Sequence, residues 1–425
     1  MLDGLRERIR VVGPGLVLAA AGIGAGDVVV ASVSGLRFGT ALLWAVVFTA
    51  GLKFVVTEAL ARWQFATGET MVRALVTRLS PGVSRVFAAY LLFWTFMVGA
   101  SLSSACGMAG ASLWPGISAP VWGAIHAALA AALVATNRFV VFQRVMKGLV
   151  AVMALSVLAC ALVAAPAWRS VLGGLTWPRI PADGGGRAVL ALIGGIGGSL
   201  TVVCYGYWMR AAAWGGVRRL PTVRGDLRLA YGFTGLFGVA LMVIAAGVAG
   251  SAAGGTGIAL EVAARLQEVA GPAGRWVFLI GFWCTVFTAM LGVWQGVPQI
   301  YVDLVQAWRK QVAEPRGTSA PIVSDCGGTA VAAWDRRVEW AALFFLAGPP
   351  QVLLWFRQPV TVVVAFSIAG AFVMPFLAAV LLYLNNRRDW MGVLANGRLG
   401  NTALVFSLFV FGVVCCAEVI GALHS

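Results

Sequence analysis

The sequence predicts an all-α integral membrane protein with about eleven transmembrane helices, and three observations support this. The 425 residues are 60% hydrophobic and only 11% charged, whereas soluble domains carry about 25% charged residues. The apolar runs reach helix length, about 18 residues or more, which is too long for the strands of a membrane barrel. The first run contains Gly22, Gly24, Gly26 and Asp27, which are unfavourable in a continuous membrane helix.

Eleven apolar runs are separated by polar or turn-forming connections. We expect the first run to be retained as a helix, because it is too long for a signal peptide and carries Asp27. The runs lie at about 13–36, 38–61, 86–113, 119–136, 148–167, 188–213, 229–250, 274–298, 340–356, 359–385 and 403–422.

No connection is long enough for a soluble domain, so residues 1–425 are predicted to form a single transmembrane domain. The longest polar connection, at about 310–339, is predicted to be a flexible cytoplasmic loop. A first repeat at about 13–167, a second at about 188–385 and an extra helix at about 403–422 account for the eleven runs.

The basic residues predict the orientation in the membrane. With the N-terminus in the cytoplasm, cytoplasmic segments hold 23 of the 31 Lys and Arg residues, outside connections hold 7, and Lys53 lies inside a span. This bias places the C-terminus outside and predicts a multi-pass protein of the cell membrane, plasma or inner. The net charge of +15 therefore indicates a lipid-bilayer partner and no nucleic acid. None of these features specifies an oligomeric state.

The reactive residue types argue against an enzyme. The seven cysteines show no CxxC spacing, and only His126 and His424 are present. No Ser/His/Asp or Cys/His constellation and no phosphate-binding loop can be assembled, so neither hydrolysis nor ATP-driven transport is indicated. No cofactor is expected, and a bound divalent cation would be a substrate.

A second interrupted run predicts the architecture. The sixth run carries four glycines in Gly194–Gly198 and another at Gly206. Runs one and six hold matching positions in two five-span halves, which is typical of inverted-repeat transporters with discontinuous helices 1 and 6 and a mid-membrane site between them. The alternative is that these glycines only allow close helix packing.

Asp27 is the main candidate for the site. It could ligate a cation, carry a coupling proton, or pair with Arg210 or Lys53. Cys204 as a thiolate would suit Zn²⁺, although a buried cysteine is often an inert packing residue. Asp27 and Cys204 with backbone carbonyls would permit Mn²⁺, Fe²⁺ or Zn²⁺, whereas Asp27 with carbonyls and waters suits Mg²⁺. Tyr207 and its aromatic neighbours would instead favour an amine or amino acid.

Scaffold motifs along the whole chain resemble those of the Nramp family of divalent-metal transporters, which share the LeuT-type fold. The resemblance implies a 5+5 inverted repeat plus one extra helix, working by alternating access. The motifs are Gly13-Pro14-Gly15-Leu16, Phe38-Gly39, Leu42-Leu43-Trp44, Ala61-Arg62, Thr67-Gly68, Leu382–Arg388, Met391-Gly392 and Asn401.

The site motifs of the family are altered. Its Asp-Pro-Gly-Asn falls on Gly24, Ala25, Gly26 and Asp27 here. Its Met-Pro-His-Asn falls on Cys204-Tyr205-Gly206-Tyr207, with Thr201 at a carbonyl-ligand position, and its second histidine falls on Ala211. The third run has no acidic residue. The expected substrate-binding residues are Gly24, Asp27, Thr201, Cys204 and Tyr207, with Asp27 and Cys204 as metal ligands.

The resemblance therefore implies transport of a divalent metal ion (Mn, Fe, Zn or Mg) through an altered site, without the usual proton coupling. Two other functions fit the same residues. One is a carrier of a small organic solute, an amine or an amino acid, on the same scaffold. The other is a membrane receptor or structural protein that does not transport.

Overall fold

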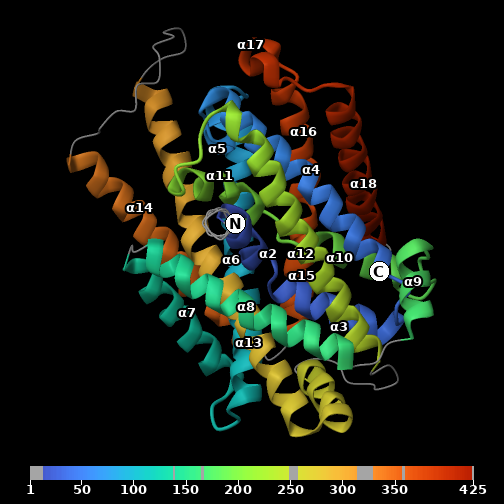
Figure 1. The fold of residues 1–425 in the computed structure, drawn as a ribbon. Coiled ribbons are helices and arrows are strands. Elements are labelled where there is room, and N and C mark those ends of the chain that lie inside the picture. Colours follow the sequence, from blue (N-terminus) through green and yellow to red (C-terminus); the bar gives the residue numbers. More distant parts are fainter. Residues whose placement is uncertain are drawn as a thin grey trace, which may run out of the picture.

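The structure is a computed structural model, and it describes residues 13–136, 139–163, 167–247, 257–313, 329–356 and 359–423. Within these ranges the chain is helical and contains no strand (Figure 1). The first half comprises α2 (Pro14–Gly22), α3 (Ala25–Phe38), α4 (Leu43–Thr67), α5 (Met71–Thr77), α6 (Pro81–Leu113), α7 (Ala119–Ala135), α8 (Phe139–Val163) and α9 (Trp168–Thr176). The second half comprises α10 (Gly185–Gly195), α11 (Thr201–Ala211), α12 (Leu220–Ala246), α13 (Gly257–Ala313), α14 (Thr329–Ala347), α15 (Pro359–Ala371), α16 (Val373–Asn385), α17 (Arg388–Met391) and α18 (Arg398–Leu423).

Length and apolarity identify seven helices of the described chain that can cross a membrane, or up to nine if each of two bent pairs is one span. Two further apolar helices, α7 and α10, are shorter. Each of the eleven predicted runs falls on a helix or a broken pair of helices. One bent pair is α2 with α3, which meet at 51°, as the glycines of the first run predict.

The connections differ from the sequence prediction in two places. Short helices α5 and α9 lie in segments expected to be connections. The loop predicted at about 310–339 is helical at both ends, because α13 continues to Ala313 and α14 begins at Thr329. Residues 314–328 lie outside the described part of the chain. Helix α13 is also longer than predicted and contains a kink at Gly271, whose φ is 68°.

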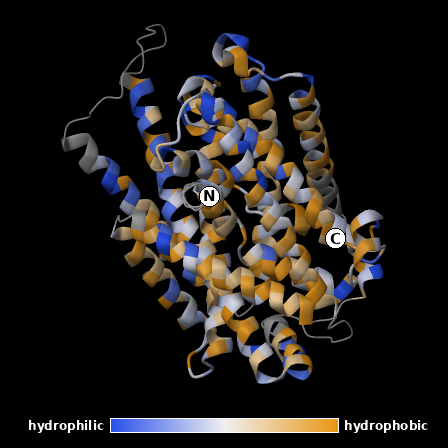
Figure 2. Ribbon diagram, in the orientation of Figure 1, coloured by the Kyte–Doolittle hydropathy of each residue, from blue (hydrophilic) through white to orange (hydrophobic). Residues whose placement is uncertain are grey.

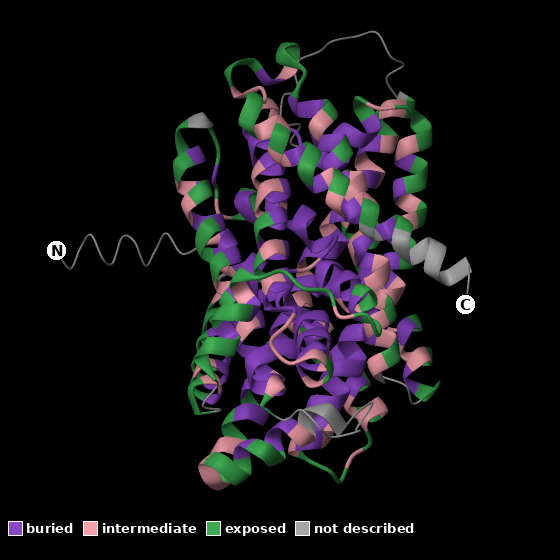
Figure 3. Cartoon of the chain, turned by 90° about the vertical axis from the view of Figure 1, so that its right-hand side faces the viewer, coloured by how far each residue is buried: buried purple, intermediate pink, exposed green. Residues whose placement is uncertain are grey.

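The helices form one bundle around the broken pairs. Helix α3 packs against α10 and α12, and α2 packs against α11, α12 and α13. Buried residues concentrate in the middle of the bundle (Figure 3), and apolar residues dominate most of the ribbon between its two ends (Figure 2). Helices α5 and α17 lie toward one end of the bundle, and α9 lies on its flank (Figure 1). The orientation in the membrane that the basic residues indicate stays a prediction.

Candidate functional site

The first break separates α2 from α3. Helix α2 ends at Gly22, and Gly24 caps the start of α3 with extended backbone. Asp27, whose side chain is buried with 1% exposed, lies in the first turn of α3, where its Oδ2 accepts the Gly24 N–H at 2.9 Å. A carboxylate at this position satisfies a freed N–H and complements the positive end of the helix dipole.

The second break separates α10 from α11 and needs glycine. Between Gly195 and Thr201 the backbone turns through Gly197 and Gly198, with φ of 74° and 72°. Only glycine adopts this left-handed conformation without cost, so the cluster that the sequence shows is required for the turn. The break leaves the carbonyls at the end of α10 without helical partners.

The two breaks lie against each other through their backbones. A Cβ atom on Gly22 would lie 3.0 Å from the carbonyl carbon of Gly197, and one on Gly26 would lie 3.0 Å from the Cα of Gly195. These glycines therefore allow close packing of the two breaks, and whether they also form a binding site stays a prediction. Asp27 links the two breaks, because its Oδ1 accepts the Gly197 N–H at 2.9 Å.

Lys53 of α4 supplies the cation of this site. Its side chain is fully buried, with 0% exposed. The ammonium donates to the carbonyls of Gly194, at 3.3 Å, and of Ile196 and Gly198. A lysine ammonium has three N–H donors, and all three carbonyl acceptors come from the second break. Lys53 therefore occupies a cage of oxygens of the kind that binds metal cations.

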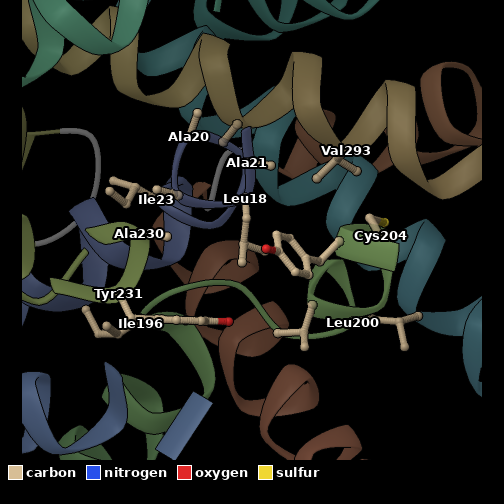
Figure 4. Packing of buried hydrophobic residues seen from close by; sticks show 14 of the residues in the cluster. Leu18, Ala20, Ala21, Ile23, Ile196, Leu200, Cys204, Ala230, Tyr231 and Val293 are labelled. Atoms are coloured by element: carbon tan, nitrogen blue, oxygen red, sulfur yellow. The ribbon is translucent and has the colours of Figure 1, made fainter. Parts of the chain in front are cut away.

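Asp27 and Lys53 hold the same segment with opposite charges. The carboxylate contacts a backbone N–H of Gly197, and the ammonium contacts the carbonyls on either side of it. The two charges interact electrostatically. Apolar residues of the breaks themselves are also buried: Ile23, Ile196 and Leu200 are 0% exposed, and Figure 4 shows them with Tyr231 among packed apolar residues. In such dry surroundings each charge depends on its partners.

The structure clarifies which cation lies near Asp27. Lys53 and Arg210 are the two candidates from the sequence. Arg210 lies on an exposed part of α11 and donates to the Gly68 carbonyl at 3.5 Å. Lys53 is therefore the basic residue associated with the breaks. Its target carbonyls lie 141 to 145 residues further along the chain, so no local sequence signal identifies them.

The other predicted site residues have different surroundings. Thr201 is the first residue of α11, and its buried hydroxyl has no hydrogen-bond partner. Cys204 faces α13 (Figure 4), where a Cβ on Gly296 would lie 2.7 Å from its sulfur. Tyr207 donates to Asp303 of α13 at 3.0 Å. Gly24 contributes its N–H to Asp27. The roles of these residues in substrate binding stay predictions.

Two buried carboxylates connect helices near the site, and the sequence gives no signal for either role. Asp303 accepts hydrogen bonds from Tyr207 and Thr70 and lies 3.4 Å from an Arg73 nitrogen. Asp226 of α12 accepts the Gly15 N–H at 2.7 Å and the Tyr205 hydroxyl at 2.9 Å. The second carboxylate therefore ties the start of α2 to α11.

Ligands for a metal ion at the breaks are mostly backbone atoms. The described residues contain no group of three or more His, Cys, Asp and Glu side chains that could hold a metal. An ion at the breaks would meet the Asp27 carboxylate and the carbonyls that Lys53 now contacts. Oxygen ligands of this kind suit hard cations such as Mg²⁺ and Mn²⁺ better than soft ones.

A family model for Nramp, natural resistance-associated macrophage protein-like, matches residues 15–421. The chain belongs to the Nramp family. This is a family of transporters, so the Nramp-family chain is not an enzyme. No curated protein matches its sequence.

Solved structures show the same fold. A mutant of the Eremococcus coleocola manganese transporter has a TM-score of 0.74 at 15% identity and covers 96% of this chain and 85% of its own. The same transporter with an aromatic bis-isothiourea compound has a TM-score of 0.68 at 15% identity, over 95% of this chain and 85% of its own. Mhp1, a nucleobase-cation-symport-1 family transporter, has a TM-score of 0.54 at 13% identity, over 94% of this chain and 90% of its own. The Nramp-family chain therefore has the predicted LeuT-type fold.

Proposed function

We propose that this chain is a secondary transporter that carries a hard divalent metal ion, Mn²⁺ or Mg²⁺, by alternating access through an altered site. Family membership supports metal-ion transport. The single observation that carries the proposal is that Asp27 accepts the Gly197 N–H from the same segment, between two broken helices, whose three carbonyls contact the Lys53 ammonium. Carboxylate and carbonyl oxygens are the ligands that these ions prefer.

Lys53 explains how such a site exists without its substrate. Three carbonyls and a carboxylate in a dry interior would be costly without a cation. The Lys53 ammonium provides one and satisfies all three carbonyls. The substrate ion must displace this ammonium before it can contact the carbonyls. After release, the ammonium returns and stabilises the empty carrier.

This role for Lys53 supports transport without the usual proton coupling. A proton-coupled carrier needs a group that brings a proton through the bundle. Helix α6 has no acidic residue. His126 of α7 contacts Trp122 and Trp283, so its hydrogen bonds are away from the breaks. With a tethered cation at the site, the empty carrier can return without a coupling ion.

Uptake into proteoliposomes tests this function. We expect saturable uptake of Mn²⁺ and Mg²⁺ that exceeds uptake of Zn²⁺. Asp27→Asn should reduce uptake at least about 100-fold, since it removes the carboxylate that links the two breaks and charged hydrogen bonds contribute roughly 1.5–3 kcal/mol each. Asp183→Asn makes the same chemical change at an exposed residue and should leave uptake unchanged.

A pH-sensitive dye inside the same vesicles tests the coupling. No acidification should accompany metal uptake. Acidification that requires the metal would contradict the proposed absence of proton coupling. Absence of uptake of all three ions by folded wild-type protein would contradict metal transport. Amines and amino acids would then be screened for binding by thermal shift, as substrates of an organic-solute carrier.

A further inference from the structure

A groove of about 630 Å³ lies outside the candidate ion site. Its lining comes from α4, from the first turns of α12, and from the segment 393–404, which includes the first turns of α18. Helix α4 packs against both α12 and α18, so it forms the floor between them. Figure 1 shows these helices together on one side of the bundle.

Basic side chains dominate the charge of this groove. Arg62, Arg224 and Arg228 line it together with one carboxylate, Glu58, which gives a formal net charge of +2. Glu58 lies 3.1 Å from Arg62 and 2.8 Å from Arg224, so one acid is shared by two guanidinium groups. Arg228 is exposed, and the ion pairs of the described chain include none with it.

Arg62 is buried beside the groove and is incompletely paired. Its side chain is 91% buried, yet its Nε has no hydrogen-bond partner. An unpaired donor of a buried guanidinium is costly and indicates a missing acceptor. The guanidinium lies against Gly400, where an added Cβ would be 3.6 Å from Nη1. The Nε atom itself is closed to solvent, so an anion in the groove would be attracted by the positive charge of Arg62 without accepting from this Nε.

The remaining walls of the groove are apolar. Phe54 and Val55 extend the floor along α4, and Leu404 closes it against α18. Val393 and Leu399, 94% and 85% exposed, stand at the rim. A small soluble anion would gain no binding energy from such apolar walls. The groove therefore combines anion-binding donors at one end with an apolar surface of the kind that an acyl chain covers.

The position of the arginines matches the headgroup level of a membrane. Helix α12 begins at Leu220, so Arg224 and Arg228 lie roughly 6 and 12 Å along it at about 1.5 Å per residue. The excess of basic residues places this end of the bundle at the cytoplasmic leaflet, where anionic lipids concentrate.

We propose that the groove binds one phospholipid with an anionic headgroup. Its phosphate lies between Arg224 and Arg228, beside the Glu58–Arg62 ion pair, and an acyl chain lies along Phe54 and Val55. The binding site adjoins the position of Lys53 on α4, because Phe54 is the next residue. A bound lipid thereby packs against the helix that delivers the ammonium to the breaks.

Lipid binding is measured by native mass spectrometry of the full chain in detergent, with added phosphatidylglycerol, phosphatidylcholine or inorganic phosphate. Phosphatidylglycerol should bind and the other two should not. The double variant Arg224→Gln/Arg228→Gln should weaken binding about thirtyfold, at about 1 kcal/mol for each basic residue near the membrane surface. Arg85→Gln/Arg169→Gln, at two exposed arginines elsewhere, should keep full binding.

A second variant tests the apolar walls without changing charge. Ala403→Phe fills the groove beside Leu404 and should weaken phosphatidylglycerol binding while the arginines remain. Equal binding of phosphatidylglycerol and phosphatidylcholine would overturn the proposal. So would binding of inorganic phosphate alone, which would assign the site to a free anion, or full binding by both groove variants when gel filtration shows them folded.

Discussion

The two broken helices satisfy their freed backbone groups in opposite ways. In the first break, Asp27 accepts the N–H of Gly24, only three residues away. In the second, Lys53 donates to carbonyls that follow it by 141 to 145 residues. The freed N–H of the first break is thus satisfied by a residue close to it in sequence, whereas the freed carbonyls of the second break depend on another helix, α4. In the proposed function a bound cation replaces Lys53 at the second break, whereas Asp27 binds backbone N–H groups of both breaks.

The largest effect is expected when the charges of Asp27 and Lys53 are removed, first separately and then together. Lys53→Met leaves three carbonyls unpaired and Asp27 without its cation, so the free energy of unfolding should fall by roughly 3–5 kcal/mol. Asp27→Asn should also destabilise the protein. The double variant removes both charges and should be more stable than the sum of the single effects by about 0.5–3 kcal/mol.

Thermal unfolding in detergent measures the three variants against wild type. Lys147→Met, at an exposed lysine of α8, is the control for the lysine change and should have little effect. If the two single effects simply add, the two charges do not stabilise each other, and the described role of Lys53 is wrong.

A smaller effect distinguishes the second break from an ordinary glycine turn. Gly68 and Gly198 both have a positive φ of 72°, but a Cβ on Gly68 would meet nothing within 4 Å, whereas one on Gly198 would overlap the Thr201 hydroxyl. Gly68→Ala should lower stability by roughly 1–2 kcal/mol through backbone strain alone. Gly198→Ala should cost about 1–3 kcal/mol more, from overpacking. Equal effects in the same melting experiment would show that the second break is not tightly packed.

The smallest effect is expected at Cys204. Its sulfur packs against Gly296 of α13, so Cys204→Ala should change the affinity for Mn²⁺ and Mg²⁺ by less than about twofold. Stability should fall by about 1 kcal/mol through the lost packing. Cys106→Ala, at another fully buried cysteine, is the matched control. Loss of metal binding in Cys204→Ala, with binding kept in Cys106→Ala, would show that the Cys204 thiolate is a metal ligand.

The features that could be predicted from the sequence are those with local signals. Apolar runs predict the helices, two glycine clusters predict the breaks, and the four-residue spacing of Glu58 and Arg62 matches a salt bridge of 3.1 Å. Asp27 also lies three residues after the N-cap Gly24, a spacing at which a carboxylate can accept the N–H of the capping residue. All of these interactions lie within one or two helical turns.

The partners of Lys53, Asp303 and Asp226 could not be predicted in this way. Each joins helices that are distant in sequence, and the choice depends on how the helices rotate and pack. The same is true of Cys204, because a small rotation of α11 decides whether its sulfur faces Asp27 or α13. A single sequence contains the residue types but not these rotations.

Isothermal titration of Mn²⁺ into the purified wild type, Lys53→Met and Lys147→Met proteins tests the central claim most directly. If the ammonium occupies the place of the transported cation, removing it opens the carbonyl cage, and Lys53→Met should bind Mn²⁺ at least about tenfold more tightly, a gain of about 1.4 kcal/mol. Lys147→Met should bind like wild type. Folded Lys53→Met protein that binds Mn²⁺ no more tightly than wild type would contradict the claim.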